Sequence, residues 1–147
     1  TTLSLAPGIT VELAAELVFA IRGGVLNSLG TEEERISIRN IPEQSNFGTI
    51  LVDDGTATMA YTTITNGGGI EVGTEDLQAN MVIASFTSDD DKVGRAVFQG
   101  GMENSGAEYG LAFQNYPGSA GTTKASGCEG MGPFYWPEPN DKSGQCE

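Results

Sequence analysis

The sequence predicts an α+β domain in which one N-terminal helix packs on an antiparallel β-meander of about six or seven strands. A disulfide-closed, irregular loop is expected at the C-terminal end. Three observations lead to this prediction: apolar residues at helical spacing between Gly8 and Leu29, short alternating runs over residues 31–116, and two cysteines near the end of the chain. The length of 147 residues suits a single domain, 1–147, with a sizeable core.

Residues 1–7 form a short, β-prone arm. Polar and apolar residues alternate from Thr2 to Leu5, ahead of Pro7-Gly8. This pattern predicts an edge strand or a loose terminus. A second interpretation is a strand that pairs with the sheet of a neighbouring subunit.

Residues 8–30 carry the pattern of a helix, in which two apolar stripes follow helical spacing and lie side by side. The stripes consist of Leu13, Leu17, Ala20 and Ile21, and of Ala14, Val18, Ile21 and Val25. Phe19 extends the apolar surface beyond the single face that a surface helix needs. We therefore expect either a central core helix or a helix shared between copies in an assembly. Leu17, Phe19 and Ile21 are the candidate interface residues.

Glycines and charges limit this helix. Each glycine costs about 1 kcal/mol relative to alanine inside a helix, so Gly23-Gly24 either bends it or ends it at Arg22. Glu12, Glu16 and Arg22 interrupt the apolar run, which therefore lacks the ~20 apolar residues that a membrane span requires.

Residues 31–116 are predicted to form the β-meander. Short runs of alternating or apolar residues, separated by turn residues, predict its strands. The expected strands are 35–41, 47–52, 56–65, 70–72, 81–86, 93–99 and 108–115. Asp53-Asp54-Gly55 predicts a tight hairpin turn between two of them, because Asp-Gly is a strong hairpin signal. No repeat is strong enough to indicate a solenoid.

Residues 117–147 form a tail rich in glycine and proline, which predicts no long regular element. Cys128 and Cys146 are the only cysteines of the chain and predict one disulfide and an oxidising compartment. A disulfide here would stabilise the fold by about 3 kcal/mol on chain-entropy arguments.

The tail also contains the aromatic cluster Phe134-Tyr135-Trp136, next to Pro137. Tyrosine and tryptophan on a rigid loop can anchor a partner protein or stack on a sugar ring. The alternative is that these rings cover the sheet, because the tail has few other apolar groups with which to dock.

Two acidic runs could supply oxygen ligands for calcium, namely Asp89-Asp90-Asp91 and Asp53-Asp54. Neither has the twelve-residue spacing of an EF-hand loop. The alternative is a solvated turn in which aspartate satisfies local backbone groups. Calcium is therefore the one cofactor that the sequence leaves open.

Charge and composition restrict the function further. A net charge of −13 predicts repulsion from nucleic acid and from anionic lipid. The chain has no histidine, which removes the common base of nucleophilic catalysis. No phosphate-binding or dinucleotide motif occurs either, and the sequence predicts no enzymatic activity.

In gross layout, with an N-terminal helix, a β-meander and a C-terminal loop closed by Cys128 and Cys146, the chain resembles the globular part of a type IV pilin. The resemblance implies a filament subunit. The first functional hypothesis is an extracellular structural subunit that assembles with copies of itself into a filament, pilus-like fibre, surface layer or virion coat. The alternative is a monomeric secreted module that binds a carbohydrate or a host-surface protein through Tyr135 and Trp136.

Overall fold

The computed structural model describes residues 1–71, 78–85, 92–114, 123–135 and 146. All regular elements in these residues are β-strands. The strands are β1 (Thr2–Leu5), β2 (Thr10–Leu13), β3 (Val18–Arg22), β4 (Val25–Leu29), β5 (Ile36–Asn40), β6 (Thr49–Asp53), β7 (Thr56–Ala60), β8 (Thr62–Thr65), β9 (Ala79–Ala84), β10 (Arg95–Phe98), β11 (Glu103–Ser105), β12 (Tyr109–Gln114), β13 (Lys124–Ser126) and β14 (Phe134–Tyr135).

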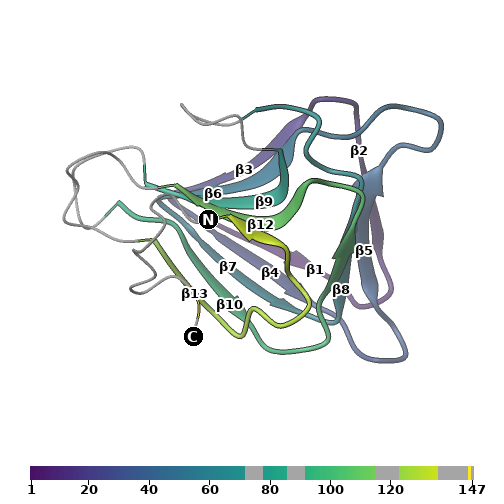
Figure 1. Ribbon diagram of the computed structural model, residues 1–147. Helices are drawn as coiled ribbons and strands as arrows, with labels where there is room; N and C mark the ends of the chain where they lie inside the picture. The colour runs from purple at the N-terminus through teal and green to yellow at the C-terminus, as the bar shows by residue number, and fades with distance from the viewer. Residues whose placement is uncertain (72–77, 86–91, 115–122, 136–145, 147) are drawn as a thin grey trace.

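The strands form three sheets that make the three sides of a triangle (Figure 1). Sheet A has the order β1-β4-β7-β10-β13, sheet B the order β11-β8-β5-β2, and sheet C the order β14-β12-β9-β6-β3. From β1 to β12 the chain visits A, B and C in turn, β13 and β14 then join A and C, and every pair of neighbouring strands is parallel. The fold is therefore a parallel β-helix, a stack of coils with the core inside the triangle.

The predicted N-terminal helix is wrong. Residues 8–30 contain β2, β3 and the start of the next coil in β4. Val11 and Leu13 face inward from β2, and Phe19 and Ile21 face inward from β3. A corner with Glu16 at φ 61° separates the two strands. Two short alternating runs offset by a corner produce the same spacing as one helical stripe, which explains the error.

The predicted antiparallel meander is also wrong, although most of its strands lie close to their predicted positions. The turn at Asp53-Asp54-Gly55 shows why. Asp54 has a φ of 53°, whereas a two-residue type I′ hairpin needs positive φ at both central residues. The chain therefore turns a corner from β6 in sheet C into β7 in sheet A instead of reversing.

The coils differ in length, and the sequence therefore shows no regular repeat that would indicate a solenoid. Thr2 pairs with Val25, which pairs with Thr56, at separations of 23 and 31 positions. Thr56 in turn pairs with Arg95, 39 positions further along the chain. A repeat of varying length leaves no fixed period in the sequence, which is why no repeat strong enough to indicate a solenoid was found.

The pilin-like layout fails for the same reasons. It requires an N-terminal helix and an antiparallel sheet, and neither occurs in the described residues. The described part of the chain also offers no candidate for a membrane-spanning helix.

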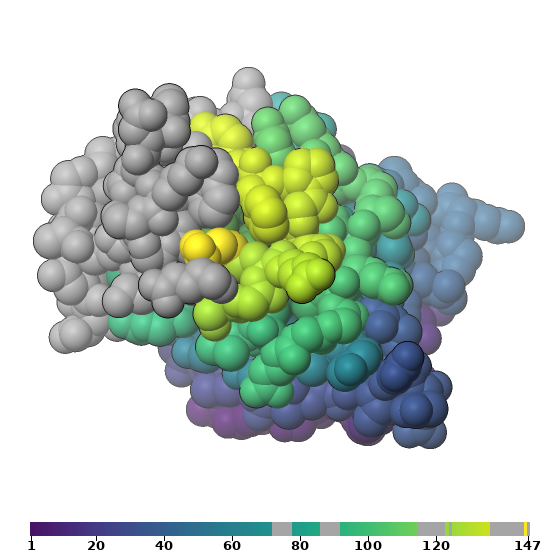
Figure 2. All heavy atoms as spheres, turned by 60° about the horizontal axis from the view of Figure 1, so that its bottom comes forward, coloured from purple at the N-terminus to yellow at the C-terminus, as the bar shows by residue number. Residues whose placement is uncertain are grey.

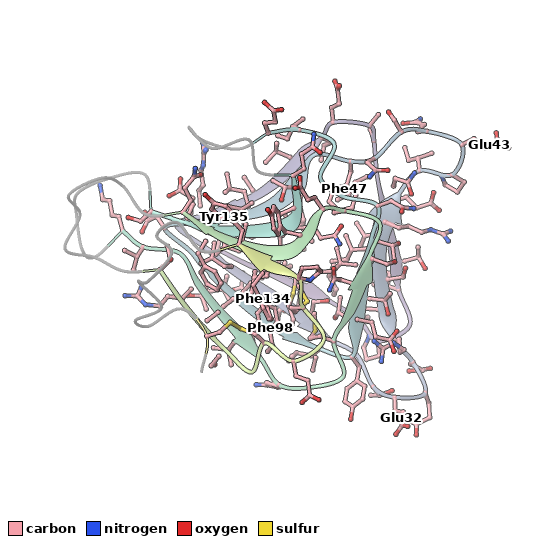
Figure 3. All side chains as sticks on the ribbon, in the orientation of Figure 1. Glu32, Glu43, Phe47, Phe98, Phe134 and Tyr135 are labelled. Carbon is pink, nitrogen blue, oxygen red and sulfur yellow. A yellow bond between two sulfur atoms is a disulfide. The ribbon has the colours of Figure 1, made fainter. Side chains whose placement is uncertain are left out.

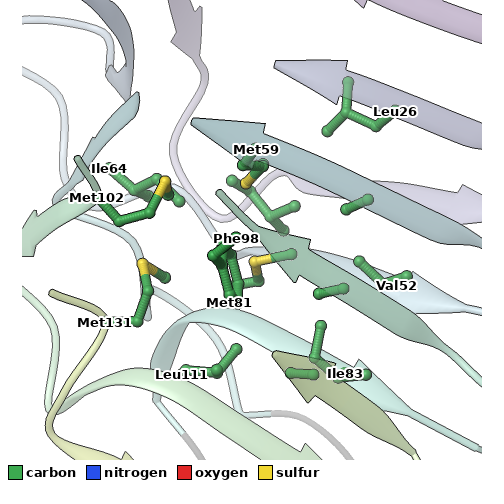
Figure 4. Packing of buried hydrophobic residues seen from close by; sticks show 14 of the residues in the cluster. Leu26, Val52, Met59, Ile64, Met81, Ile83, Phe98, Met102, Leu111 and Met131 are labelled. Atoms are coloured by element: carbon green, nitrogen blue, oxygen red, sulfur yellow. The ribbon is translucent and has the colours of Figure 1, made fainter. Parts of the chain in front are cut away.

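Apolar side chains of successive coils stack on one another inside the triangle. In sheet C, the register places Ile50, Met81 and Leu111 in one column, and all three are fully buried. Figure 4 shows Met81 and Leu111 in this interior with Phe98 of sheet A nearby. Because each inward residue contacts the one above and the one below, a coil in the middle of the stack is buried on both sides.

A second, smaller cluster lies on the outer face of sheet C. It contains the buried residues Leu51, Val82 and Ala112, against which Tyr109 and Tyr135 pack. Sheet C is thus covered on both faces, and β9 is buried along its whole length. The prediction of a buried strand near residues 81–86 is confirmed for β9.

Polar contacts join coils at the corners. Arg35 lies at the corner between sheets A and B, where its Nη2 donates to the Gly101 carbonyl oxygen at 2.6 Å. Its Nε donates to Thr63 Oγ1 at 3.1 Å, and its guanidinium lies 6.0 Å from the Tyr61 ring centroid. Arg35 therefore connects three successive coils.

The predicted disulfide is present between Cys128 and Cys146, with 6.1 Å between the Cα atoms. Cys146 also makes a parallel bridge with Ala125 of β13. Disulfides persist in oxidising compartments, so the bond is consistent with such a setting. In Figure 2 the C-terminal yellow segments lie above the green coil, and the purple N-terminal segment lies at the opposite, lower edge.

Candidate functional site

The N-terminal end of the β-helix is open. The first coil, β1 to β3, supplies an edge strand to each of the three sheets. Within the described residues nothing pairs with the outer side of these strands. Each outer side therefore presents unpaired backbone N–H and C=O groups, the kind of edge that accepts another strand.

Inward-facing side chains of the first coil are exposed where their neighbours in the second coil are buried. Leu3 is 47% exposed, whereas its register partner Leu26 is 1% exposed. Ile9 is 41% exposed and precedes the Thr10–Ser37 pair, which aligns it with the fully buried Ile36. These residues point into the core, and within the described part of the chain no further coil covers them.

An apolar groove of about 160 Å³ opens at this end. Leu3 and Phe19 line it together with Ile21, Val25 and Leu26. The groove lies between β1 and β3, so it belongs to the same exposed end of the core. We call the open edges of β1 to β3, the inward side chains Leu3, Leu5, Ile9, Val11 and Phe19, and this groove the N-terminal end face.

The N-terminal end face is poor in charge although the protein is strongly acidic. The first coil contains Glu12, Glu16 and Arg22, a net charge of −1, against −13 for the whole chain. Two of these charges are directed at the second coil, since Glu12 contacts Arg39 at 3.5 Å and Arg22 contacts Asp53 at 3.3 Å. The end face is therefore mostly apolar, with Arg22 at the edge of its groove.

Near the opposite end of the stack, the described core residues are buried. Met102 is 5% exposed, Met131 is fully buried, and Cys128 is 6% exposed. Asn104 of β11 donates through Nδ2 to the carbonyl oxygens of Gly130 and Gly132 at 2.8 and 2.9 Å. These hydrogen bonds join β11 to the segment that precedes β14.

The three residues predicted as a helical interface have different environments. Phe19 and Ile21 point inward from β3, where Ile21 is buried and Phe19 is partly buried. Leu17 lies before β3 and is 41% exposed. They share no helical stripe, but Phe19 and Ile21 both line the end-face groove.

The aromatic cluster of the tail is divided. Phe134 packs against the main core, whereas Tyr135 packs on the outer face of sheet C. The rings of Tyr135 and Tyr109 meet edge to face, with 5.4 Å between their centroids. Figure 3 shows Phe134 directed toward Phe98 and Tyr135 separate from them. Trp136 lies outside the described residues.

The acidic runs differ in what can be described. Asp89, Asp90 and Asp91 lie outside the described residues, and among the residues described no three acidic or cysteine side chains gather as a metal site. Burial raises the pKa of the Asp53 carboxyl, Arg22 lowers it, and the neighbouring Asp54 raises it again. Asp53 is therefore a partly buried partner of Arg22.

A second groove, of about 320 Å³, follows the corner between sheets C and A. Its lining includes Asp54, Arg95 and Thr56, together with the glycines of successive corners. The groove is polar and open, and its lining shows no buried, unpartnered group directed into it.

Sequence reasoning missed the end face because it assigned the first coil to a helix. One signal could have revealed the coils: Gly24, Gly55 and Gly94 each precede the first residue of a sheet A strand. Comparison of the chain with protein-family models, with curated proteins and with solved structures gives no match.

Proposed function

We propose that this protein is a non-catalytic structural subunit of an extracellular or cell- or virion-surface assembly, in which it associates with copies of itself. The observation that carries the proposal is the N-terminal end face, where Leu3 and Ile9 point into the core yet remain exposed. Exposed apolar side chains at the end of a solenoid favour association with another surface. Association would remove these side chains from water at ~25 cal/mol per Å² of apolar surface.

An exterior location rests on two further features. The Cys128–Cys146 disulfide is typical of secreted proteins, and the net charge of −13 suits a saline or calcium-rich medium. Calcium bound by aspartates outside the described residues could reduce repulsion between acidic copies, so calcium belongs in the test.

Sedimentation velocity over a wide range of protein concentrations, with calcium and with a chelator, tests the proposal. We expect the sedimentation coefficient to rise with concentration and electron microscopy to show assemblies of defined form. A monomer under every condition would contradict self-assembly.

A carbohydrate- or protein-binding module is the second candidate. The Tyr109–Tyr135 pair favours it, because these two partly exposed rings are held edge to face on the outer side of sheet C. Paired aromatic rings can stack on sugars with little loss of side-chain entropy. A change in intrinsic fluorescence on titration with soluble polysaccharides, absent in Tyr135→Ala, would support this candidate.

A further inference from the structure

We propose that the Cys128–Cys146 disulfide is a redox-controlled latch, which holds Cys146 docked on the core beside β13. When the bond is reduced, Cys146 leaves this position while the rest of the β-helix stays folded. The latch lies beside β13, at the edge of sheet A opposite β1. The inference is therefore independent of the N-terminal end face and of the proposed self-assembly.

The first step is the position of Cys146. The inward side chains of sheet A form a column, in which strand pairing aligns Leu26, Ala57, Ala96 and Ala125. All four are at most 5% exposed. Cys146 pairs in parallel with Ala125 and packs against the same core. Cys146 therefore takes the next position of this column.

The second step is the difference between the two cysteines. Cys128 is 6% exposed and belongs to the core, and its carbonyl oxygen accepts from Met131 N at 3.0 Å. Gly127 before it has a φ of 69°, and a Cβ there would collide with the Phe98 carbonyl oxygen, so this turn lies close against β10. Cys146 is partly buried, and within the described residues its pairing with β13 is an isolated bridge. Cys128 is therefore the fixed end of the bond, and Cys146 is the end that the bond holds in place.

The third step is the contribution of the bond to docking. Cys128 and Cys146 are 18 positions apart, and ordering a chain of this length costs conformational entropy. An isolated bridge offsets little of this cost. The covalent bond to Cys128 keeps Cys146 at a high effective concentration beside Ala125. Reduction removes this constraint and shifts Cys146 from the docked to the released position.

The bond opens by thiol–disulfide exchange with a dithiol reductant. One thiolate of the dithiol attacks Sγ of Cys146, the less buried of the two residues, and the S–S bond breaks. Cys128 leaves as a thiolate and takes up a proton. The second thiol of the reductant then attacks the mixed disulfide, closes a cyclic disulfide and releases the thiol of Cys146. The dithiol is oxidised, and the protein disulfide is reduced to two thiols.

The redox state of the surroundings therefore sets the state of the latch. Disulfides persist in oxidising compartments and are rare where thiols are kept reduced. Among the described residues, Cys146 is the partner of β13 on the side away from β10. Its release opens this edge of sheet A, and an open edge can accept another strand. The latch keeps the edge occupied in an oxidising medium.

Alkylation of the folded, reduced protein tests the latch. The protein is reduced with dithiothreitol in dilute solution, freed of reductant without air and treated with iodoacetamide. Mass spectrometry of its peptides then gives the reaction rate at each cysteine. We expect Cys146 to react about tenfold faster than Cys128 or more, because Cys128 stays in the core. Circular dichroism checks that the reduced protein is folded.

Two results of this experiment would overturn the inference. An equally slow reaction at both cysteines would mean that Cys146 stays docked without the bond. An equally fast reaction at both would mean that reduction opens the core around Cys128, so that the bond does more than hold Cys146.

Cys146→Ala provides a second test without reductant, because it removes the bond and leaves Cys128 in the core. Amide exchange in β13, relative to β9, should be about tenfold faster or more in this variant than in the native protein. Dithiothreitol should accelerate exchange in the native protein and leave the variant unchanged. The same rate in β13 with and without the bond would contradict the latch. Neither test requires association, so the latch and self-assembly can fail separately.

Discussion

Single residues with left-handed backbone geometry make the corners of this β-helix. Glu16, Asp54, Tyr61 and Asn66 have φ values of 61°, 53°, 44° and 62°. Asparagine and aspartate tolerate this region because of their short polar side chains, but glutamate and tyrosine rarely adopt it. One such residue redirects the chain into the next sheet, so β7 and β8 are separated by Tyr61 alone.

Asp53 should make stability depend on pH. Its pKa is raised above the ordinary value, mainly by burial, so the folded state binds a proton more tightly than the unfolded state does. Stability should therefore fall as the pH rises from about 4 through the folded pKa of Asp53. Asp53→Asn should reduce this fall, measured by urea unfolding between acidic and neutral pH.

The control for Asp53→Asn is Glu32→Gln, which removes the same charge from an exposed position in the 31–35 corner loop. A pH dependence that is unchanged in Asp53→Asn, or reduced equally in Glu32→Gln, would contradict the assignment.

Asn80 is a buried polar residue that joins sheets C and B. Its Oδ1 accepts from Gly67 N at 2.8 Å, and its Nδ2 donates to Asn104 Oδ1 and to the Ser105 carbonyl oxygen, both at 3.1 Å. Asn80→Ala leaves these groups unpaired and should lower the free energy of unfolding by about 1–3 kcal/mol. Asn27→Ala on β4 is the control, and an equal loss in both variants would contradict a special role for Asn80.

At the scale of elements, the sequence located strands but not their partners. Alternation placed strands near β5 and β10, because each has one face in the core and one outside. Strand direction depends on the backbone conformation of the corner. With one left-handed residue, Asp54, the chain continues into the next sheet and does not reverse into a hairpin. Asp-Gly occurs in both kinds of turn, so local sequence could not decide between them.

A glycine column marks the corner between sheets C and A. The carbonyl oxygens of Gly24 and Gly55 accept from Thr56 N and Arg95 N at 3.0 and 2.9 Å. A Cβ at Gly55 would lie 3.0 Å from the Gly24 carbonyl oxygen, and one at Gly94 would collide with the Val52 carbonyl oxygen. Close stacking of the corners thus requires glycine, and the uneven spacing of these glycines concealed the repeat.

The disulfide should stabilise the element that closes the last coil. Cys128 packs in the main core, and Cys146 bridges to Ala125 of β13. The double variant Cys128→Ser, Cys146→Ser should lose about 3 kcal/mol of unfolding free energy on chain-entropy arguments. Chemical unfolding measures the loss, and dithiothreitol should destabilise the native protein similarly while leaving the double variant unchanged. A double variant as stable as the native protein would contradict this role.

At the scale of the whole molecule, a β-helix is stable where coils are stacked on both sides. The middle coils meet this condition, since Ile50, Met81 and Ile83 are fully buried. Among the described residues the first coil is stacked on one side, and β1, β2 and β3 are edge strands of the three sheets. The exposure of Leu3 and Ile9 could not be predicted from the sequence, because both are apolar residues of the kind that fill the core.

This arrangement predicts how amide hydrogen exchange should vary along the stack. In dilute protein, the outward amides of Thr2 and Ser4 should exchange fast, and those of β9 in the middle of sheet C should exchange slowest. Raising the concentration should slow exchange in β1, β2 and β3 and leave β9 unchanged, because only the edge strands gain partners. Leu3→Asp should abolish this concentration dependence. Equal protection of β1 and β9 in dilute protein would mean that the first coil is already covered within a single molecule. This result would contradict association through the end face.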